Sequence, residues 1–164
     1  MRLAVALFVA LVASTAVARP TLQSLQGDVT VVAFFSTVCA PCKVELPMVE
    51  ALRSSLAGDA RVRVVAVSVD EPRDAARARA MAQRLGLTAP VLVDARSYAQ
   101  LFGNGELAVP RLAVIDRARR GLDRVGARAG ETRDDFVREV TAAVASVEAG
   151  APQPPTPMWR SLRK

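Results

Sequence analysis

The stretch Phe34-Phe35-Ser36-Thr37-Val38-Cys39-Ala40-Pro41-Cys42-Lys43-Val44-Glu45-Leu46-Pro47 contains both cysteines of the 164-residue chain, separated by two residues. The apolar run 29–35 before the cysteines predicts a buried strand, and apolar residues at helical spacing after them predict a helix over 40–57. Cys39 then lies at the N-terminus of a helix, where free N–H groups and the helix dipole stabilise a thiolate. Cys42 follows on the same helix face, so that it can close a small disulfide with Cys39. Such motifs lower the pKa of the first cysteine from ~8.5 to the range ~3.5–7.5, which predicts a site of thiol–disulfide exchange.

Other uses of a cysteine pair fit this spacing less well. A purely structural disulfide stabilises a protein more when it closes a long loop, and this loop is short. A closed zinc site needs further Cys or His ligands, whereas the chain has two cysteines and no histidine. Two thiolates can still hold a soft cation such as Cu(I), so a copper-binding carrier stays an alternative. We otherwise expect no metal and no cofactor.

The length and composition fit one globular domain with a sizeable core. Apolar residues make up 51% and charged residues 23% of the chain, and the formal net charge is +6. The basic residues are nearly all arginines spread along the chain, without the aromatic interleaving or the motifs of nucleic-acid-binding proteins. We therefore expect a monomer with no nucleic-acid partner.

The N-terminus has the pattern of a secretory signal peptide. A basic residue precedes an apolar run, and small residues at its end predict cleavage after Ala18. This pattern predicts a signal peptide over 1–18, a domain over 19–149 and a periplasmic or otherwise exported protein. The alternative is a membrane anchor formed by residues 3–18, although the apolar run is short for a membrane span.

The domain alternates strand-like and helix-like segments. Apolar runs bounded by turn signals predict further strands over 62–69, 90–94, 111–116 and 122–125. Helical spacing predicts helices over 72–85 and 97–102, and a last helix that begins after Thr132 with Asp135 in an approximate capping box. This order predicts an α/β fold with a central mixed sheet flanked by helices and a late hairpin at its edge.

The last segment, 150–164, differs in composition from the domain. It contains four prolines within 152–157, followed by Met158, Trp159 and basic residues. Proline removes backbone donors and disfavours both helix and sheet, so this segment predicts a disordered or extended Pro-rich basic tail. The alternative is a weak surface contact through Trp159 and its basic neighbours.

With these elements in place, the chain resembles the thioredoxin superfamily, and more narrowly the exported TlpA/ResA-type thiol–disulfide oxidoreductases. The resemblance runs from about Leu25 to Val147. It rests on the aromatic strand end, on Cys39-Ala40-Pro41-Cys42 followed by Glu45 and Pro47, and on Val109-Pro110 before a strand. The segment with the predicted second helix and third strand resembles the TlpA-type helix–strand insertion. The resemblance therefore implies a thioredoxin-like fold.

The resemblance also assigns roles to residues outside the cysteine motif. It implies that Pro110 is cis and shields the cysteines, and that the backbone of Val109 pairs with an extended substrate strand. The alternative for Pro110 is a trans proline at a strand edge. Val38 and Pro41 belong to the same group of shielding and substrate-binding residues. Pro47 is a structural residue, and we expect it to kink the helix that contains it.

Two departures from the family pattern matter. The family usually has tryptophan before the first cysteine, and here Val38 replaces it, so partner recognition is expected to differ. Thioredoxin carries a buried aspartate six residues before the first cysteine, where this chain has Ala33. Glu45 follows Cys42 on the same helix face, and it is our candidate for the group that accepts the proton of Cys42. The alternative is a carboxylate that only complements the dipole at the helix start.

These features predict a protein-disulfide reductase in which Cys39 attacks a substrate disulfide and Cys42 resolves the mixed disulfide. Expected partners are a disulfide-containing envelope protein, for which the family offers apocytochrome c as an example, and a membrane thiol donor of the type that serves TlpA/ResA relatives. The alternatives are a disulfide oxidase or isomerase, a thiol peroxidase and the Cu(I) carrier. Ala40-Pro41 and the absence of histidine favour a reductase over a strong oxidant, and Val32 at the signature proline position disfavours a peroxidase.

Overall fold

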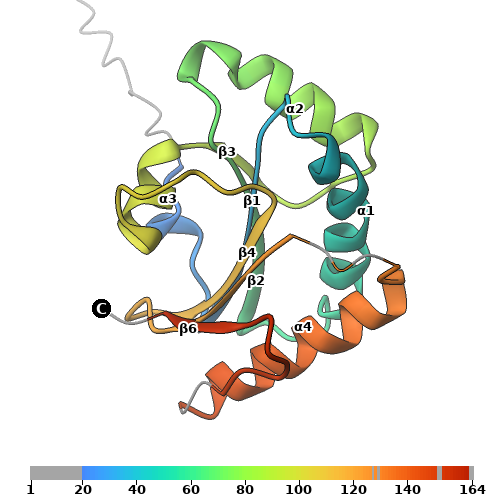
Figure 1. Cartoon of the computed structure of the whole chain (residues 1–164), viewed down its shortest axis with the longest axis vertical. Helices are drawn as coiled ribbons and strands as arrows, with labels where there is room; N and C mark the ends of the chain where they lie inside the picture. Colours follow the sequence, from blue (N-terminus) through green and yellow to red (C-terminus); the bar gives the residue numbers. More distant parts are fainter. Residues whose placement is uncertain (1–19, 127, 129, 151–152, 163–164) are drawn as a thin grey trace, which may run out of the picture.

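A mixed sheet runs through the centre of the domain (Figure 1). Its strands are β1 (Val29–Phe35), β2 (Val62–Ser68), β3 (Val91–Val93), β4 (Arg111–Asp116), β5 (Gly121–Val125) and β6 (Arg160–Leu162). The helices are α1 (Ala40–Ser55), α2 (Ala75–Arg84), α3 (Ala95–Phe102) and α4 (Arg133–Glu148), with short 3₁₀ helices η1 (Gln23–Leu25) and η2 (Pro72–Asp74). The computed structural model describes residues 20–126, 128, 130–150 and 153–162, so the predicted signal peptide over 1–18 lies outside the described residues.

The strand order is β3-β2-β1-β4-β5-β6. β1 pairs in parallel with β2, from Val29 opposite Val62 to Phe35 opposite Ser68, and β2 pairs in parallel with β3. β4 pairs antiparallel with both β1 and β5, and β5 pairs antiparallel with β6. The predicted α/β fold, with a central mixed sheet flanked by helices and a late antiparallel hairpin, is therefore confirmed.

The side chains of β1 alternate between two cores, as the pleat of a strand requires. Four of them face the larger core, which α1, α2 and α4 cover: Val29, Val31, Ala33 and Phe35. Val32 and Phe34 face the smaller core, where Tyr98 of α3 packs against them. Figure 1 shows α3 on the opposite side of the sheet from α1 and α4. Because both faces are covered, every residue of β1 is buried and the strand reads as a continuous apolar run.

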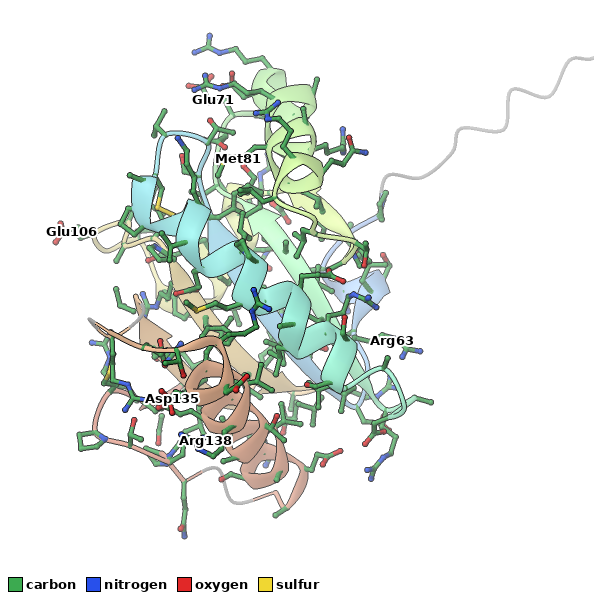
Figure 2. The ribbon with its side chains drawn as sticks, turned by 90° about the vertical axis from the view of Figure 1, so that its right-hand side faces the viewer. Arg63, Glu71, Met81, Glu106, Asp135 and Arg138 are labelled. Carbon is green, nitrogen blue, oxygen red and sulfur yellow. A yellow bond between two sulfur atoms is a disulfide. The ribbon has the colours of Figure 1, made fainter. Side chains whose placement is uncertain are left out.

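The helix ends follow local capping chemistry. α3 begins two residues before the predicted start because the carboxylate of Asp94 accepts the N–H groups of Arg96 and Ser97. α4 has the capping box that the sequence predicts, with Thr132 and Asp135 bonded reciprocally. Asp135 is labelled on this helix in Figure 2. The segment predicted as one helix over 72–85 is η2 followed directly by α2.

The prediction of a disordered tail is wrong for residues 153–162. The chain adds β6 to the sheet, with Leu122 of β5 opposite Ser161. Trp159 is 2% exposed and belongs to the larger core, where its indole N–H donates to Glu139 Oε1 at 2.7 Å. The burial of the Trp159 ring, with its N–H hydrogen-bonded, stabilises the ordered segment. The prolines before it exclude a helix there but do not prevent this packing.

Candidate active site

The two cysteines lie where the chain passes from β1 to α1. Cys39 is the N-cap residue of α1, with Pro41 in the first turn, and its Sγ accepts the N–H of Cys42 at 3.1 Å. The two sulfur atoms form a disulfide with an S–S distance of 2.07 Å, drawn as the yellow bond near the start of α1 in Figure 2. The local sequence favours this geometry because proline suits the first helical turn, where a missing N–H costs nothing.

The two sulfur-bearing residues differ in accessibility. Cys42 is 0% exposed, whereas Cys39 is half-buried and follows Val38, which is 77% exposed. Cys39 is therefore the residue of the pair that a partner can approach, whereas Cys42 is closed off from solvent. The helix N-terminus stabilises a thiolate at Cys39, since free N–H groups and the positive end of the dipole meet there.

Asp70 holds the turn that presents Cys39. Its carboxylate accepts the Ser36 hydroxyl at 2.6 Å, the Thr37 N–H at 2.9 Å and the Ser68 hydroxyl at 2.6 Å. Ser36 in turn accepts the N–H of Cys39 on its carbonyl oxygen at 3.1 Å. Burial raises the pKa of Asp70, but the bonds from Ser36, Ser68 and Thr37 outweigh it and hold that pKa below its usual value. No local pattern in the sequence marks Asp70 for this role, and the available signal is that β1 and β2 are parallel neighbours whose carboxyl ends meet.

Glu45 is buried in the protein, three residues after Cys42 in α1. It is 3% exposed, and its Oε2 has no hydrogen-bond partner among the described residues. Burial raises the pKa of Glu45 to about 7, although the Arg124 guanidinium lowers it and Glu131 raises it again. The helix-start alternative is wrong, because the first turn of α1 contains no acidic residue and Glu45 lies in the core.

The charges around Glu45 form a buried network that the sequence analysis missed. Arg124 of β5 is 0% exposed and donates to Glu131 at 2.8 and 3.2 Å and to Glu139 at 3.4 Å. Its guanidinium lies 4.7 Å from the ring centroid of Phe136. No pattern in the sequence pointed to Arg124, since it is one of many arginines and follows an acidic residue in a short strand.

The loop before β4 forms the second part of the site. The Val109–Pro110 peptide bond is cis, and Pro110 is buried. Phe34 of β1 lies opposite Arg111 of β4, so the strand end that leads to the cysteine motif and the loop before β4 meet at the same edge of the sheet. Leu107 of this loop is 53% exposed, and with Val38 it adds exposed apolar surface to these two segments. Pro47 lies inside α1 and is half-buried.

Within the described ranges, no three Cys, His, Asp or Glu residues gather as a potential metal site. None of the helices in the described part of the chain is long and apolar enough to cross a membrane.

Comparison with known proteins gives the family. The model of the AhpC/TSA family matches residues 10–120. The chain belongs to the AhpC/TSA family. Together with the similarities below, this membership confirms the resemblance to the thioredoxin superfamily.

Individual relatives of this AhpC/TSA-family chain agree with that placement. The thioredoxin-like protein YneN of Bacillus subtilis is 32% identical over 77 residues, which are 46% of this chain and 44% of YneN, so the match spans less than half of that relative. A thioredoxin-family thiol:disulfide interchange protein from Chlorobium tepidum is 24% identical, with a TM-score of 0.52 over 74% of this chain and 83% of that one. A secreted Mycobacterium tuberculosis disulfide oxidoreductase homologous to E. coli DsbE is 18% identical, with a TM-score of 0.53 over 73% and 84% of the two chains. At these identities the two solved structures show a shared fold.

The arrangement is suited to thiol–disulfide redox chemistry. This AhpC/TSA-family chain combines a reachable sulfur at a helix N-terminus with a buried second sulfur that is already bonded to it. A buried carboxyl group follows Cys42 on the same helix face, and it changes charge near neutral pH. The two cysteines can accept two electrons as a disulfide or donate two electrons as a dithiol.

Proposed function

We propose that the protein is an exported protein-disulfide reductase that works through the Cys39/Cys42 dithiol. The observation that carries this proposal is the accessible Cys39 at the start of α1, joined to the fully buried Cys42. The partner would be an oxidised envelope protein, and a membrane thiol donor would return the enzyme to its dithiol form.

The reaction has two exchange steps. The Cys39 thiolate attacks one sulfur of the substrate disulfide, the substrate S–S bond breaks, and the leaving sulfur takes up a proton. Cys42 then gives its proton to Glu45 and attacks the sulfur of Cys39, which releases the second substrate sulfur. Two electrons have passed to the substrate, and the enzyme is left with the Cys39–Cys42 disulfide.

Glu45 is the proposed proton acceptor in the second step. A general base works best when its pKa lies near the working pH, and burial raises the pKa of Glu45 to about 7. It lies three residues after Cys42 in α1, so both side chains leave the helix on the same face. A carboxylate in this position can take the proton of a thiol that water does not reach.

The substrate would bind across the loop before β4. Val109, the shielding Pro110 and the exposed Val38 are the proposed contacts, with Pro41 beside the sulfur atoms. Val38 and Leu107 offer apolar surface where an aromatic platform would otherwise lie. This composition supports recognition of apolar residues around the substrate cysteine.

The reduction potential of the Cys39–Cys42 couple tests the direction of electron flow. We expect a value near the ~−270 mV of thioredoxin, because no imidazole is present to stabilise the reduced form. A value near the ~−120 mV of strong oxidants would contradict the reductase and make the protein a disulfide donor. Cys39→Ser should abolish insulin reduction, whereas Cys42→Ser should accumulate mixed disulfides.

Two further assays separate the alternatives. Catalytic consumption of hydroperoxide would favour a thiol peroxidase, and stoichiometric uptake of Cu(I) by the reduced protein would favour a copper carrier.

Export is supported by the secreted Mycobacterium tuberculosis neighbour. Fractionation of cells tests it, since a mature-sized protein that stays in the cytosol would contradict export.

A further inference from the structure

Tyr98, the single tyrosine of the chain, forms hydrogen bonds with the loop before β4. Tyr98 of α3 is 4% exposed, and its hydroxyl bonds to both polar groups of one residue. The N–H of Ala108 donates to the Tyr98 oxygen at 2.9 Å, and the hydroxyl donates to the Ala108 carbonyl at 3.2 Å. Arg111 Nη1 also donates to this oxygen at 3.1 Å. A phenol has one donor and two acceptor sites, so the hydroxyl is fully used.

The partners of Tyr98 are themselves fixed. Arg111 donates from Nε to Asp123 at 2.8 Å, and its guanidinium lies 3.5 Å from the ring centroid of Phe102. The Tyr98 ring meets Phe34 and Phe102 edge-on, at centroid distances of 5.3 and 4.8 Å. The hydroxyl therefore acts as a rigid bracket between α3, the start of β4 and the loop.

The contacts of Tyr98 determine in which direction the backbone N–H and C=O groups of the next residue, Val109, point. Both polar groups of Ala108 point to α3, and Val109 precedes proline, which restricts Val109 to extended conformations. In an extended chain the polar groups of neighbouring residues point to opposite sides. Among the hydrogen bonds between described residues, none engages the N–H or the C=O of Val109.

We propose that Tyr98 is a positioning residue that aims the Val109 backbone at an extended peptide bonded to Cys39. The inference rests on the proposed function for the exchange at Cys39, for Val109 as a substrate contact and for peptide disulfides as the substrate class. It predicts that the protein prefers peptide thiols to small thiols. A peptide bonded to Cys39 can form hydrogen bonds with the Val109 backbone, whereas a small thiol has no peptide groups to form them.

A competition at Cys39 tests the inference in the full-length Cys42→Ser protein. The protein is equilibrated with a blocked, unstructured peptide containing one central cysteine and with 2-mercaptoethanol, each as thiol and disulfide. Intact-mass spectrometry after acid quenching gives the ratio of the two Cys39 adducts. Tyr98→Phe keeps the ring and removes only the hydroxyl, so it isolates the bracket.

The chain offers a matched control for the loss of such a hydroxyl. Ser146 Oγ donates to the Gln153 carbonyl at 3.1 Å and accepts the Gln153 N–H at 2.6 Å, the same double contact in another part of the molecule. We expect the peptide-to-mercaptoethanol ratio to fall about threefold to tenfold in Tyr98→Phe and to stay unchanged in Ser146→Ala.

Four results would overturn the inference. They are an unchanged ratio in Tyr98→Phe, an equal fall in Ser146→Ala, no preference for the peptide before substitution, and loss of cooperative thermal unfolding in Tyr98→Phe. The equilibrium does not depend on the direction of electron flow. A protein that fails to reduce insulin yet loses its peptide preference on Tyr98→Phe would therefore refute the reductase and keep the role of Tyr98.

Discussion

Glu45 is a carboxyl group held inside the protein, and its Oε2 has no hydrogen-bond partner in the described part of the chain. The Arg124 guanidinium lowers the pKa of Glu45, but Glu131 already accepts two hydrogen bonds from that guanidinium. Burial consequently dominates and raises the pKa of Glu45 from 4.5 to about 7. The residue is protonated in mild acid and ionised in mild base, so it can both hold and release a proton in the physiological range.

The first prediction concerns stability in Glu45→Gln. Between pH 4.5 and about 7 the folded protein retains a proton that the unfolded chain has lost, so the folding free energy becomes less favourable as the pH rises through this window. Glutamine removes this penalty. We expect Glu45→Gln to be more stable than the native protein by about 1–3 kcal/mol at pH 8 and equal to it near pH 4. Urea unfolding at the two pH values measures the difference, and a constant difference would contradict the burial argument.

The second prediction concerns the rate of resolution. Glutamine cannot accept the proton of Cys42, so the second exchange step should slow about tenfold to a hundredfold at pH 7. Rapid-quench analysis of the mixed disulfide separates this step from the first attack by Cys39, which should keep its rate. The difference should shrink at alkaline pH, where the thiol ionises without help. An unaltered second step at neutral pH would remove Glu45 from the mechanism.

At the scale of the element, α1 carries a second glutamate with the opposite behaviour. Burial alone would raise the pKa of Glu50, but hydrogen bonds from Arg53 and Thr88 outweigh it and lower that pKa to about 2. Thr88 follows α2, and its N–H and hydroxyl donate to Glu50 at 2.8 and 2.9 Å. The carboxylate thus ties α1 to the segment that leads into β3.

The third prediction follows from that tie. The folded pKa of Glu50 is below its unfolded value, so the stabilisation is present above pH 4.5 and is lost as the pH falls through about 2. Glu50→Gln should destabilise the protein by about 1–2 kcal/mol at pH 7, and the difference should vanish near pH 2. Thermal unfolding across this range checks it, with Glu45→Gln as the comparison of opposite sign. Equal stability at pH 7 would show that solvent screens the contact.

Most elements of the fold were predictable because their signals are local. The continuous apolar run of β1 and the cysteine motif at the start of α1 identify the strand, turn and helix without tertiary information. Asp70, Tyr98 and Arg124 were not predictable in the same way. Each acts through partners brought close by strand pairing or helix packing, and their own neighbours in the sequence carry no distinguishing pattern.

The C-terminal segment shows a different limit at the scale of the whole molecule. Proline content indicated that residues 150–164 lack regular structure, yet Trp159 is in the core and the chain continues into β6. Glu139 Oε1 accepts the Trp159 N–H at 2.7 Å, the Thr156 hydroxyl at 3.1 Å and a bond from Arg124. The tail is thereby attached to the same buried charges that surround Glu45.

The fourth prediction tests this attachment. Trp159→Phe keeps an aromatic ring but removes the indole N–H that donates to Glu139 Oε1, and we expect a loss of about 1–3 kcal/mol in unfolding free energy. Urea unfolding followed by circular dichroism measures it, with Ser146→Ala as a control that loosens the tail at another point. In the native protein the single tryptophan gives an independent signal, and its fluorescence should change in the same transition as the circular dichroism. A tail that docks separately would instead give two transitions.

The strand order has a consequence for association between molecules. β3 and β6, the two outer strands, are each three residues long, whereas β5 has five residues. Outer strands have unpaired N–H and C=O groups that can bond to other chains, and a short outer strand has few such groups. β6 therefore pairs with the edge of the five-residue strand β5 and leaves only a three-residue strand at the border of the sheet. Release of the tail would uncover the edge of β5 that β6 pairs with, next to Val125, which is exposed already. We expect such molecules to aggregate edge to edge while the intact protein stays dispersed.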